Sequence, residues 1–265
     1  MASKKRPVLL AVILLVLALA IAWLALRSSP SVEPAPPVEE SAPPEAPQER
    51  FRPRPVPPPS DRSEPPAPEP STPLPESLDD SDEAVQEALQ ELDPALTEWL
   101  TPEQQLRKWV ALVDGAAVGK LPAQHSPLRY TMGAFQAREE QGELTMSTAN
   151  YQRAAPLVDA LVRIPPEQLA EAYQHWLPLL EQAYGELGQG GSLEDRLRQA
   201  IDHILEIEPL EEPVALQRPS VYYTYDDEEL ERADPLTKLM WRLGPDNTRR
   251  IQEQLRELKK QLWNE

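Results

Sequence analysis

The chain has 265 residues, of which 44 are acidic and 26 are basic, and its formal net charge is −18. This balance argues against nucleic-acid binding, which requires a basic surface. The sequence has no Cys, which excludes disulfides, thiolate metal ligands and a cysteine nucleophile. It has 32 Pro, and 18 of them lie between Pro30 and Pro75, so that stretch is not expected to form a core. About 190 residues remain, which is enough for one folded domain.

The N-terminal residues predict a membrane anchor. Residues 1–6, the predicted cytoplasmic tail, hold three basic residues, and residues 7–26 contain no charge. Twenty helical residues span roughly 30 Å, the thickness of a bilayer's hydrocarbon core. Because a single basic residue, Arg27, directly follows the span, we expect a transmembrane helix with its N-terminus in the cytoplasm. A cleaved signal peptide is the alternative, although its apolar region is usually shorter.

Residues 28–77 predict a disordered linker rich in Pro and Glu. Runs of Pro favour the polyproline II conformation, in which fifty residues reach at most roughly 150 Å. Such a segment can carry a domain away from the membrane, or act as a tether with no required reach. It also contains a PxxP motif at Pro55-Val56-Pro57-Pro58, so a ligand for a Pro-binding module is a third reading.

Residues 78–265 predict one compact, mainly helical domain. Asp80 with Glu83, and Thr101 with Gln104, have the spacing of capping boxes and predict two helix starts. Ser192 predicts a third, ahead of an apolar stripe. The last helix is expected to begin near Pro245. Its apolar residues Ile251, Leu255, Leu258 and Leu262 indicate a helix that closes the core, with self-association as the alternative.

Short strands are predicted at two places. Gly142 separates residues 135–138 from residues 143–146, which indicates a β-hairpin. Further on, Val221, Tyr223 and Tyr225 alternate with polar residues and Tyr222. This alternation predicts one short strand with Tyr223 and Tyr225 packed inward on the same side as Val221, and with Tyr222 facing outward or meeting a partner.

Several short strings resemble a bacterial family, domain of unknown function 3014. Among them are Gly119-Lys120-Leu121-Pro122, Ala149-Asn150-Tyr151 and Leu243-Gly244-Pro245-Asp246-Asn247. The resemblance runs from about Leu78 to Leu262. It implies a membrane-anchored protein of the Gram-negative envelope with a Pro-rich spacer, and it implies no established activity.

No catalytic, cofactor or metal motif is found. The chain has no Gly-rich phosphate loop, no Gly-x-Ser-x-Gly and no His-Glu-x-x-His, so we expect no cofactor. Asp202 and His203 lie at the edges of an apolar stripe and are weak candidates. The acidic runs at residues 226–229 and 139–140 would suit a glycosidase. The alternative is that they complement a helix dipole and flank a turn.

One basic stretch interrupts the acidic domain, which has 34 acidic and 18 basic residues from Asp80 onward. No acidic residue occurs between Asp114 and Glu139, where Lys120, Arg129 and Arg138 lie. Together with Tyr222, these residues are the candidate binding patch, because loops on a rigid scaffold often carry binding residues. Alternatively, they pair with the acidic surface around them.

These observations favour a single-pass inner-membrane protein with the bulk of its chain in the periplasm. We expect a non-enzymatic binding or scaffold protein whose partner is an envelope protein or a wall component. Two alternatives stay open, namely an enzyme or enzyme regulator acting on cell-wall polymer and a sensor of a small anionic ligand. The sequence predicts no oligomeric state.

Overall fold

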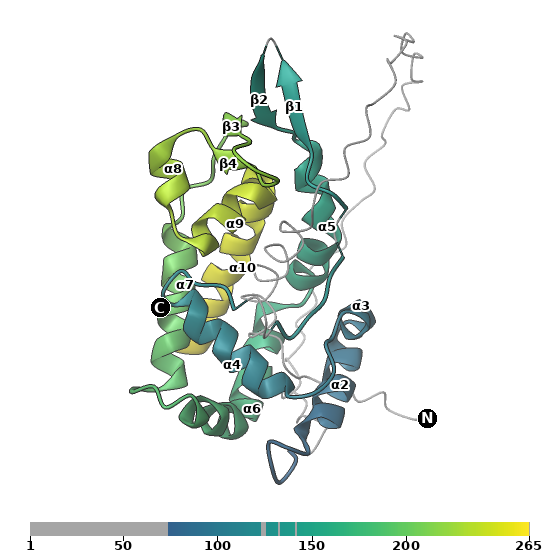
Figure 1. Ribbon diagram of the computed structural model, residues 1–265. Coiled ribbons are helices and arrows are strands. Elements are labelled where there is room, and N and C mark those ends of the chain that lie inside the picture. Colours follow the sequence, from purple (N-terminus) through teal and green to yellow (C-terminus); the bar gives the residue numbers. More distant parts are fainter. Residues whose placement is uncertain (1–73, 123–125, 132, 141, 265) are drawn as a thin grey trace, which may run out of the picture. The chain divides into compact units, whose positions relative to one another are not determined.

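The computed structural model describes residues 74–264 apart from 123–125, 132 and 141 (Figure 1). The predicted tail, membrane span and most of the linker lie outside these residues. The described part is mainly helical and has two small antiparallel strand pairs, which confirms the predicted fold class of the domain. None of the helices within it has the length and apolar character needed to cross a bilayer.

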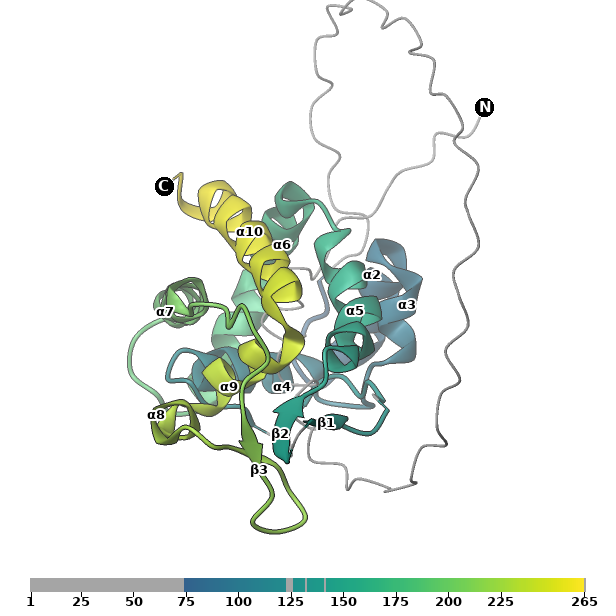
Figure 2. The ribbon, with the colours of Figure 1, turned by 90° about the horizontal axis from the view of Figure 1, so that it is seen from above.

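The helices form the core and the strands lie at one end of it. The helices are α2 (Ser81–Leu92), α3 (Pro94–Glu98), α4 (Gln105–Ala116), α5 (Ala149–Val162), α6 (Pro166–Glu186), α7 (Leu193–Glu206), α8 (Glu228–Arg232), α9 (Pro235–Leu243) and α10 (Pro245–Trp263). The strands are β1 (Ala137–Glu140), β2 (Glu143–Met146), β3 (Leu216–Gln217) and β4 (Thr224–Tyr225). The C-terminal helix α10 packs against α5, α6, α7 and α9, and α4 packs against α2, α6 and α7 (Figure 2).

The apolar stripe of α10 lies inside the core, as predicted. Ile251, Leu255 and Leu258 are fully buried, and Leu262 packs against the core from its rim. Helices α4 and α6 pack on each other, and each contributes a completely buried ring to the core, Trp109 from α4 and Trp176 from α6. Burial of so much apolar surface is the main stabilising contribution in a domain of this size.

Local signals set some helix starts and not others. At α7 the prediction is confirmed, because the Ser192 hydroxyl accepts a hydrogen bond of 3.1 Å from the backbone N–H of Asp195. At α2 the start is correct but the capping box is wrong. The Asp80 side chain caps no helical N–H and instead accepts a 2.7 Å bond from the Ser77 hydroxyl.

The N-terminus of α4 is capped from a distance. Thr101 does not cap it, so this predicted box is also wrong; its hydroxyl donates to the carbonyl of Ser126. The carboxylate of Asp82, in the first turn of α2, accepts bonds of 2.7 and 2.8 Å from the N–H groups of Gln104 and Gln105. Because α2 packs on α4, it brings this carboxylate to the exposed N–H groups of the next long helix.

The β1–β2 hairpin is confirmed, although β1 begins two residues later than the sequence suggests. Arg138 pairs with Thr145 and Glu139 with Leu144, and Gly142 adopts a φ of +87° at the turn. A positive φ of this kind favours glycine. An isolated bridge between Thr145 and Ala215 places β3 beside β2.

The predicted strand at residues 221–225 is shorter than expected. β4 contains Thr224 and Tyr225 alone and pairs with β3, while residues 218–223 form the loop that joins the two strands. The expectation that Val221 packs inward is therefore wrong, since it is 55% exposed at this loop. Tyr225 is buried and Tyr222 is 50% exposed, both as predicted.

Candidate functional site

A second, smaller apolar cluster lies where the strands meet α5 and α9. Its buried members are Met146, Leu216 and Tyr225. Partly buried residues from other segments surround them, namely Phe135, Ala137, Leu144, Tyr151, Val214, Tyr223, Leu230 and Trp241. Each element contributes one or two side chains, so this end of the domain is a junction rather than the face of a single helix.

Three arginines surround this junction, each beside an aromatic ring. The guanidinium carbon of Arg153 lies 6.0 Å from the ring centroid of Phe135, and that of Arg218 lies 5.5 Å from that of Tyr223. Arg242 lies 5.6 Å from the ring of Tyr225. The rings of Phe135 and Tyr223 are themselves 5.4 Å apart. These six residues are the arginine–aromatic cluster: Phe135, Arg153, Arg218, Tyr223, Tyr225 and Arg242.

The three arginines of the cluster have no carboxylate partner in the part of the chain that the structure describes. Several other arginines do have such partners: Arg107 lies between Asp79 and Glu186, and Arg196 binds Asp114 at 2.8 Å. Within the described residues, the guanidinium groups of the cluster are not neutralised by a direct ion pair, although Glu143 and Asp226 line the same groove as Arg218. Guanidinium groups bind carboxylates and phosphates through two parallel hydrogen bonds.

The surroundings of the cluster combine burial with access to solvent. Burial raises the pKa of Tyr225, while the positive charge of Arg242 acts in the opposite direction. Burial also lowers the pKa of Arg153. An open groove of about 510 Å³ runs between β2 and β3, and Arg218 and Asp226 contribute to its walls. A ligand in this groove would lie beside the exposed loop that carries Tyr222.

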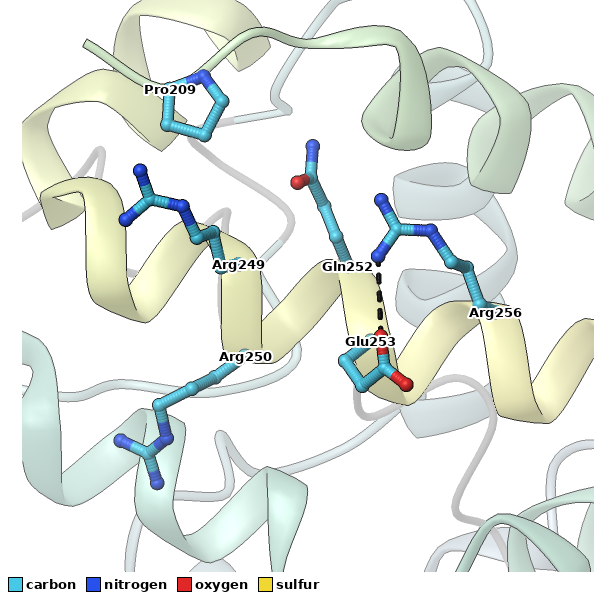
Figure 3. Close-up of a pocket in the computed structure, with 6 residues that line it drawn as sticks. All are labelled: Pro209, Arg249, Arg250, Gln252, Glu253 and Arg256. Atoms are coloured by element: carbon cyan, nitrogen blue, oxygen red, sulfur yellow. Dashed lines mark hydrogen bonds and ion pairs between the residues drawn. The ribbon is translucent and has the colours of Figure 1, made fainter. Parts of the chain in front are cut away.

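A second groove, of about 540 Å³, lies along α10 (Figure 3). Arg249, Gln252 and Arg256 point to the side of Pro209, whereas Arg250 points away from it (Figure 3). All three arginines in this groove are engaged. Arg249 binds Glu211 and Asp246, Arg250 binds Asp159, and Arg256 binds Glu253. Because its positive charge is neutralised internally, this groove is a weaker candidate than the arginine–aromatic cluster.

The basic residues of the predicted patch lie on three separate segments of the fold. Lys120 is exposed beyond the C-terminal end of α4, where its N–H donates to the carbonyl of Gly115 at 2.8 Å. Arg129 lies near the other end of α4, close to Lys108 in the first turn of that helix. Burial lowers the pKa of Lys108, and the nearby charge of Arg129 lowers it further. Arg138 lies on β1 and pairs with Glu140. The twelve residues of α4 rise roughly 18 Å, so Lys120 and Arg129 do not form one small pocket.

Asp202 and His203 point to different partners. The carboxylate of Asp202 binds the Nζ of Lys259 at 2.8 Å, and Nε2 of His203 lies 3.4 Å from the carboxylate of Asp234, the N-cap of α9. In the acidic run, Asp227 caps α8 by accepting bonds from two backbone N–H groups. Within the described residues, no group of three or more His, Asp or Glu side chains is arranged to hold a metal ion.

Sequence reasoning missed the three arginines of the cluster. They are 65 and 24 residues apart in the chain and belong to no motif, so only the folded structure brings them together. The one signal in the sequence was the run of tyrosines at residues 222–225, which lies four residues after Arg218.

Two of the strings that resemble the family, at residues 149–151 and 243–247, meet next to the cluster. Gly244, with a φ of +88°, packs so closely on Tyr151 that an added Cβ would lie 2.4 Å from its ring. The side-chain N–H of Asn247 donates to the carbonyl of Tyr151 at 2.9 Å. Asn150 is 3% exposed and holds the segment before β1, as its side chain both donates to and accepts from the backbone of Gln136.

Comparison with known proteins gives one family. The family model described as "Protein of unknown function (DUF3014)" matches residues 105–259, which include the whole arginine–aromatic cluster. No curated protein and no solved structure gives a significant match. Since the matched residues make up more than half of the chain, the chain belongs to the DUF3014 family.

Proposed function

We propose that the protein is a single-pass bacterial inner-membrane protein whose periplasmic domain binds or scaffolds an anionic component of the cell envelope. The observation that carries this proposal is the arginine–aromatic cluster, in which three arginines on an acidic domain have no carboxylate partner among the described residues. Cation–π contacts hold such guanidinium groups in place without using their N–H donors.

The N-terminal sequence supports the location. The uncharged run at residues 7–26, the basic residues before it and the Pro-rich residues 28–77 are the expected plan of an anchored, tethered domain. A domain on such a tether needs a partner surface, and the 50% exposed Tyr222 beside the cluster is suited to one. Aromatic and arginine side chains are enriched at protein interfaces.

The alternative of an enzyme acting on wall polymer gains no support from the carboxylates that suggested it. Asp227 caps a helix and Glu140 pairs with Arg138. The alternative of an anionic-ligand sensor is compatible with the same cluster, since both functions require an anion at the arginines.

The test is recovery of partners from native membranes after mild cross-linking, with the full-length protein as bait. The variant Arg218→Glu combined with Tyr222→Ser alters two exposed side chains of the cluster and its loop. Lys120→Glu makes the same change of charge at the exposed end of α4 and serves as the matched control.

An envelope protein or wall fragment that is recovered with the wild type and with Lys120→Glu, but lost with the double variant, supports the proposal. Loss with Lys120→Glu alone would move the contact to the predicted basic patch. If no component is recovered in stoichiometric amount with any bait, the scaffold function is overturned.

A further inference from the structure

Arg153 has one guanidinium edge without hydrogen bonds. Its Nε and Nη2 atoms are buried and have no partner, while Nη1 donates a 2.7 Å bond to the side-chain oxygen of Asn150. Arginine stays protonated at neutral pH, so a positive charge is held here with three of its five N–H donors unpaired. Buried polar groups in folded proteins are normally paired, and an exception of this kind requires an explanation.

The surrounding side chains fix the position of this edge. Asn150 is itself fully engaged: its oxygen accepts from Arg153 and from the N–H of Gln136, and its amide donates to the carbonyls of Gln136 and Ser147. The ring of Phe135 lies 6.0 Å from the guanidinium carbon. The guanidinium group of Arg153 is therefore held by Asn150 and lies beside the ring of Phe135, which fixes the position of its unpaired edge.

The protein contains an example of what such an edge binds. In Arg107 the same two atoms, Nε and Nη2, donate to the two carboxylate oxygens of Glu186 at 2.5 and 2.9 Å. This fork geometry is the usual way in which a carboxylate meets a guanidinium. Arg153 presents the same donors with no carboxylate among the described residues to accept from them.

We propose that the Nε–Nη2 edge of Arg153 is a carboxylate-binding site. This inference rests on the proposed binding function and specifies the chemistry of the ligand: a carboxylate, from a chain terminus or from an Asp or Glu side chain, next to an apolar group. The carboxylate takes the position that Glu186 has at Arg107, and the half-buried rings of Phe135 and Tyr223 contact the apolar part. Because the edge is closed to solvent in this structure, binding displaces the groups that cover it.

The first experiment measures thermal unfolding of the full-length protein in detergent with sodium acetate, and with sodium chloride at equal ionic strength. Acetate is expected to raise the Tm of the wild type above its value in chloride. The variants Arg153→Met and Arg153→Lys are expected to lose this difference, since Lys keeps the charge but lacks the fork. Arg153→Met is further expected to match or exceed the wild-type Tm in chloride, because it removes an uncompensated buried charge.

Arg129→Met is the control, since it removes the charge of an exposed arginine outside the cluster and should keep the acetate response. The inference is overturned if chloride and acetate act equally on the wild type, or if Arg153→Met keeps the acetate response. If Arg153→Met does not fold, the Nε–H resonance of Arg153 in the wild type decides: it must shift with acetate and not with chloride.

Two peptides then distinguish the sources of the carboxylate. Acetyl-Ala-Ala-Ala with a free C-terminus presents a terminal carboxylate, and acetyl-Ala-Glu-Ala-amide presents one on a side chain. A shift of the Arg153 resonance by either one supports the site and names its source. A shift by neither overturns the inference that a chain terminus or an Asp or Glu side chain is the ligand. The inference and the proposed function can fail separately. If the wild type shows no acetate response and Arg153→Met still recovers the partner, the carboxylate site at Arg153 is overturned and the proposed binding function stands.

Discussion

At the scale of single residues, Tyr173 carries a buried hydroxyl that has no hydrogen-bond partner. It lies in a small apolar pocket between α4, α6 and α7, lined also by Val110, Val113, Leu193 and Leu197. Burial raises the pKa of Tyr173. The phenol therefore contributes its ring to packing, while its hydroxyl costs desolvation without a compensating bond.

Replacing Tyr173 by Phe is expected to leave the free energy of unfolding at pH 7 unchanged or to raise it by up to about 1 kcal/mol. The pH dependence has a definite sign. Because the folded pKa lies above the unfolded value of about 10, the wild type loses stability as the pH rises past 10, and the Phe variant does not lose this contribution. The gain from the substitution should therefore grow by about 1 kcal/mol between about pH 9 and 11.

Urea unfolding midpoints of the full chain at both pH values check this prediction. Tyr222→Phe is the control, since that ring is half exposed and should change neither midpoint. Tyr225 also has a raised pKa, but it is present in all these proteins and its contribution cancels. A loss of more than about 1 kcal/mol in Tyr173→Phe at pH 7 would mean that the hydroxyl has a partner after all.

At the scale of elements, the cap of α4 is supplied by another helix. Asp82→Ala removes a carboxylate that accepts from two N–H groups, at 2.7 and 2.8 Å. We expect a loss of about 1–2 kcal/mol in the free energy of unfolding. Asp80→Ala, two residues earlier, removes the cap that the sequence predicts but the structure lacks.

Chemical denaturation of the two alanine variants tests whether Asp82 or Asp80 stabilises a helix N-terminus. The structure predicts that Asp82→Ala lowers the free energy of unfolding clearly more than Asp80→Ala does. The free energy of unfolding of Asp80→Ala should stay within about 0.5 kcal/mol of the wild-type value. Equal losses, or the reverse order, would show that the capping box operates in solution and that the contact between α2 and α4 is not formed.

The elements that sequence reasoning predicted correctly depend on neighbouring residues. Ser192 and Asp195 are three residues apart, and Gly142 adopts the positive φ of the hairpin turn. The cap of α4 could not be predicted in this way, because Asp82 lies 22 residues before the N–H group of Gln104 that it accepts from. The strand at residues 221–225 failed for a related reason: β4 exists only where β3 offers partners, and β3 ends at Gln217.

The candidate site could be predicted still less, because it is assembled from segments far apart in the chain. Of the residues singled out in the sequence, Tyr222 lies beside the arginine–aromatic cluster, while Lys120 lies at the far end of α4 from Arg129. A net charge of −18 identifies an acidic protein but does not reveal which arginines lack a carboxylate. Whether an arginine meets a carboxylate depends on how the helices and strands pack, which the residue counts of the sequence do not give.

At the scale of the whole molecule, the proposed function depends on which side of the membrane the domain lies. Three basic residues precede the uncharged run at residues 7–26 and one follows it directly, which predicts that everything after Arg27 is translocated. Protease added to spheroplasts is therefore expected to digest the full-length chain, while a cytoplasmic marker protein stays intact. The chain should also remain with the membranes through an alkaline carbonate wash, since an uncharged run of twenty residues is long enough to span a bilayer.

A charge variant makes this prediction sharper. Replacing Lys4, Lys5 and Arg6 by Gln, and Ser28 and Ser29 by Lys, reverses the distribution of positive charge around the span. A fraction of this variant should then be protected from external protease, because basic residues favour the cytoplasmic side. If the wild type is itself protected, the domain lies in the cytoplasm, and an envelope partner on the far side of the membrane is excluded. If carbonate releases the wild type from the membranes, residues 7–26 do not anchor it, and the proposal of a membrane-tethered domain is overturned.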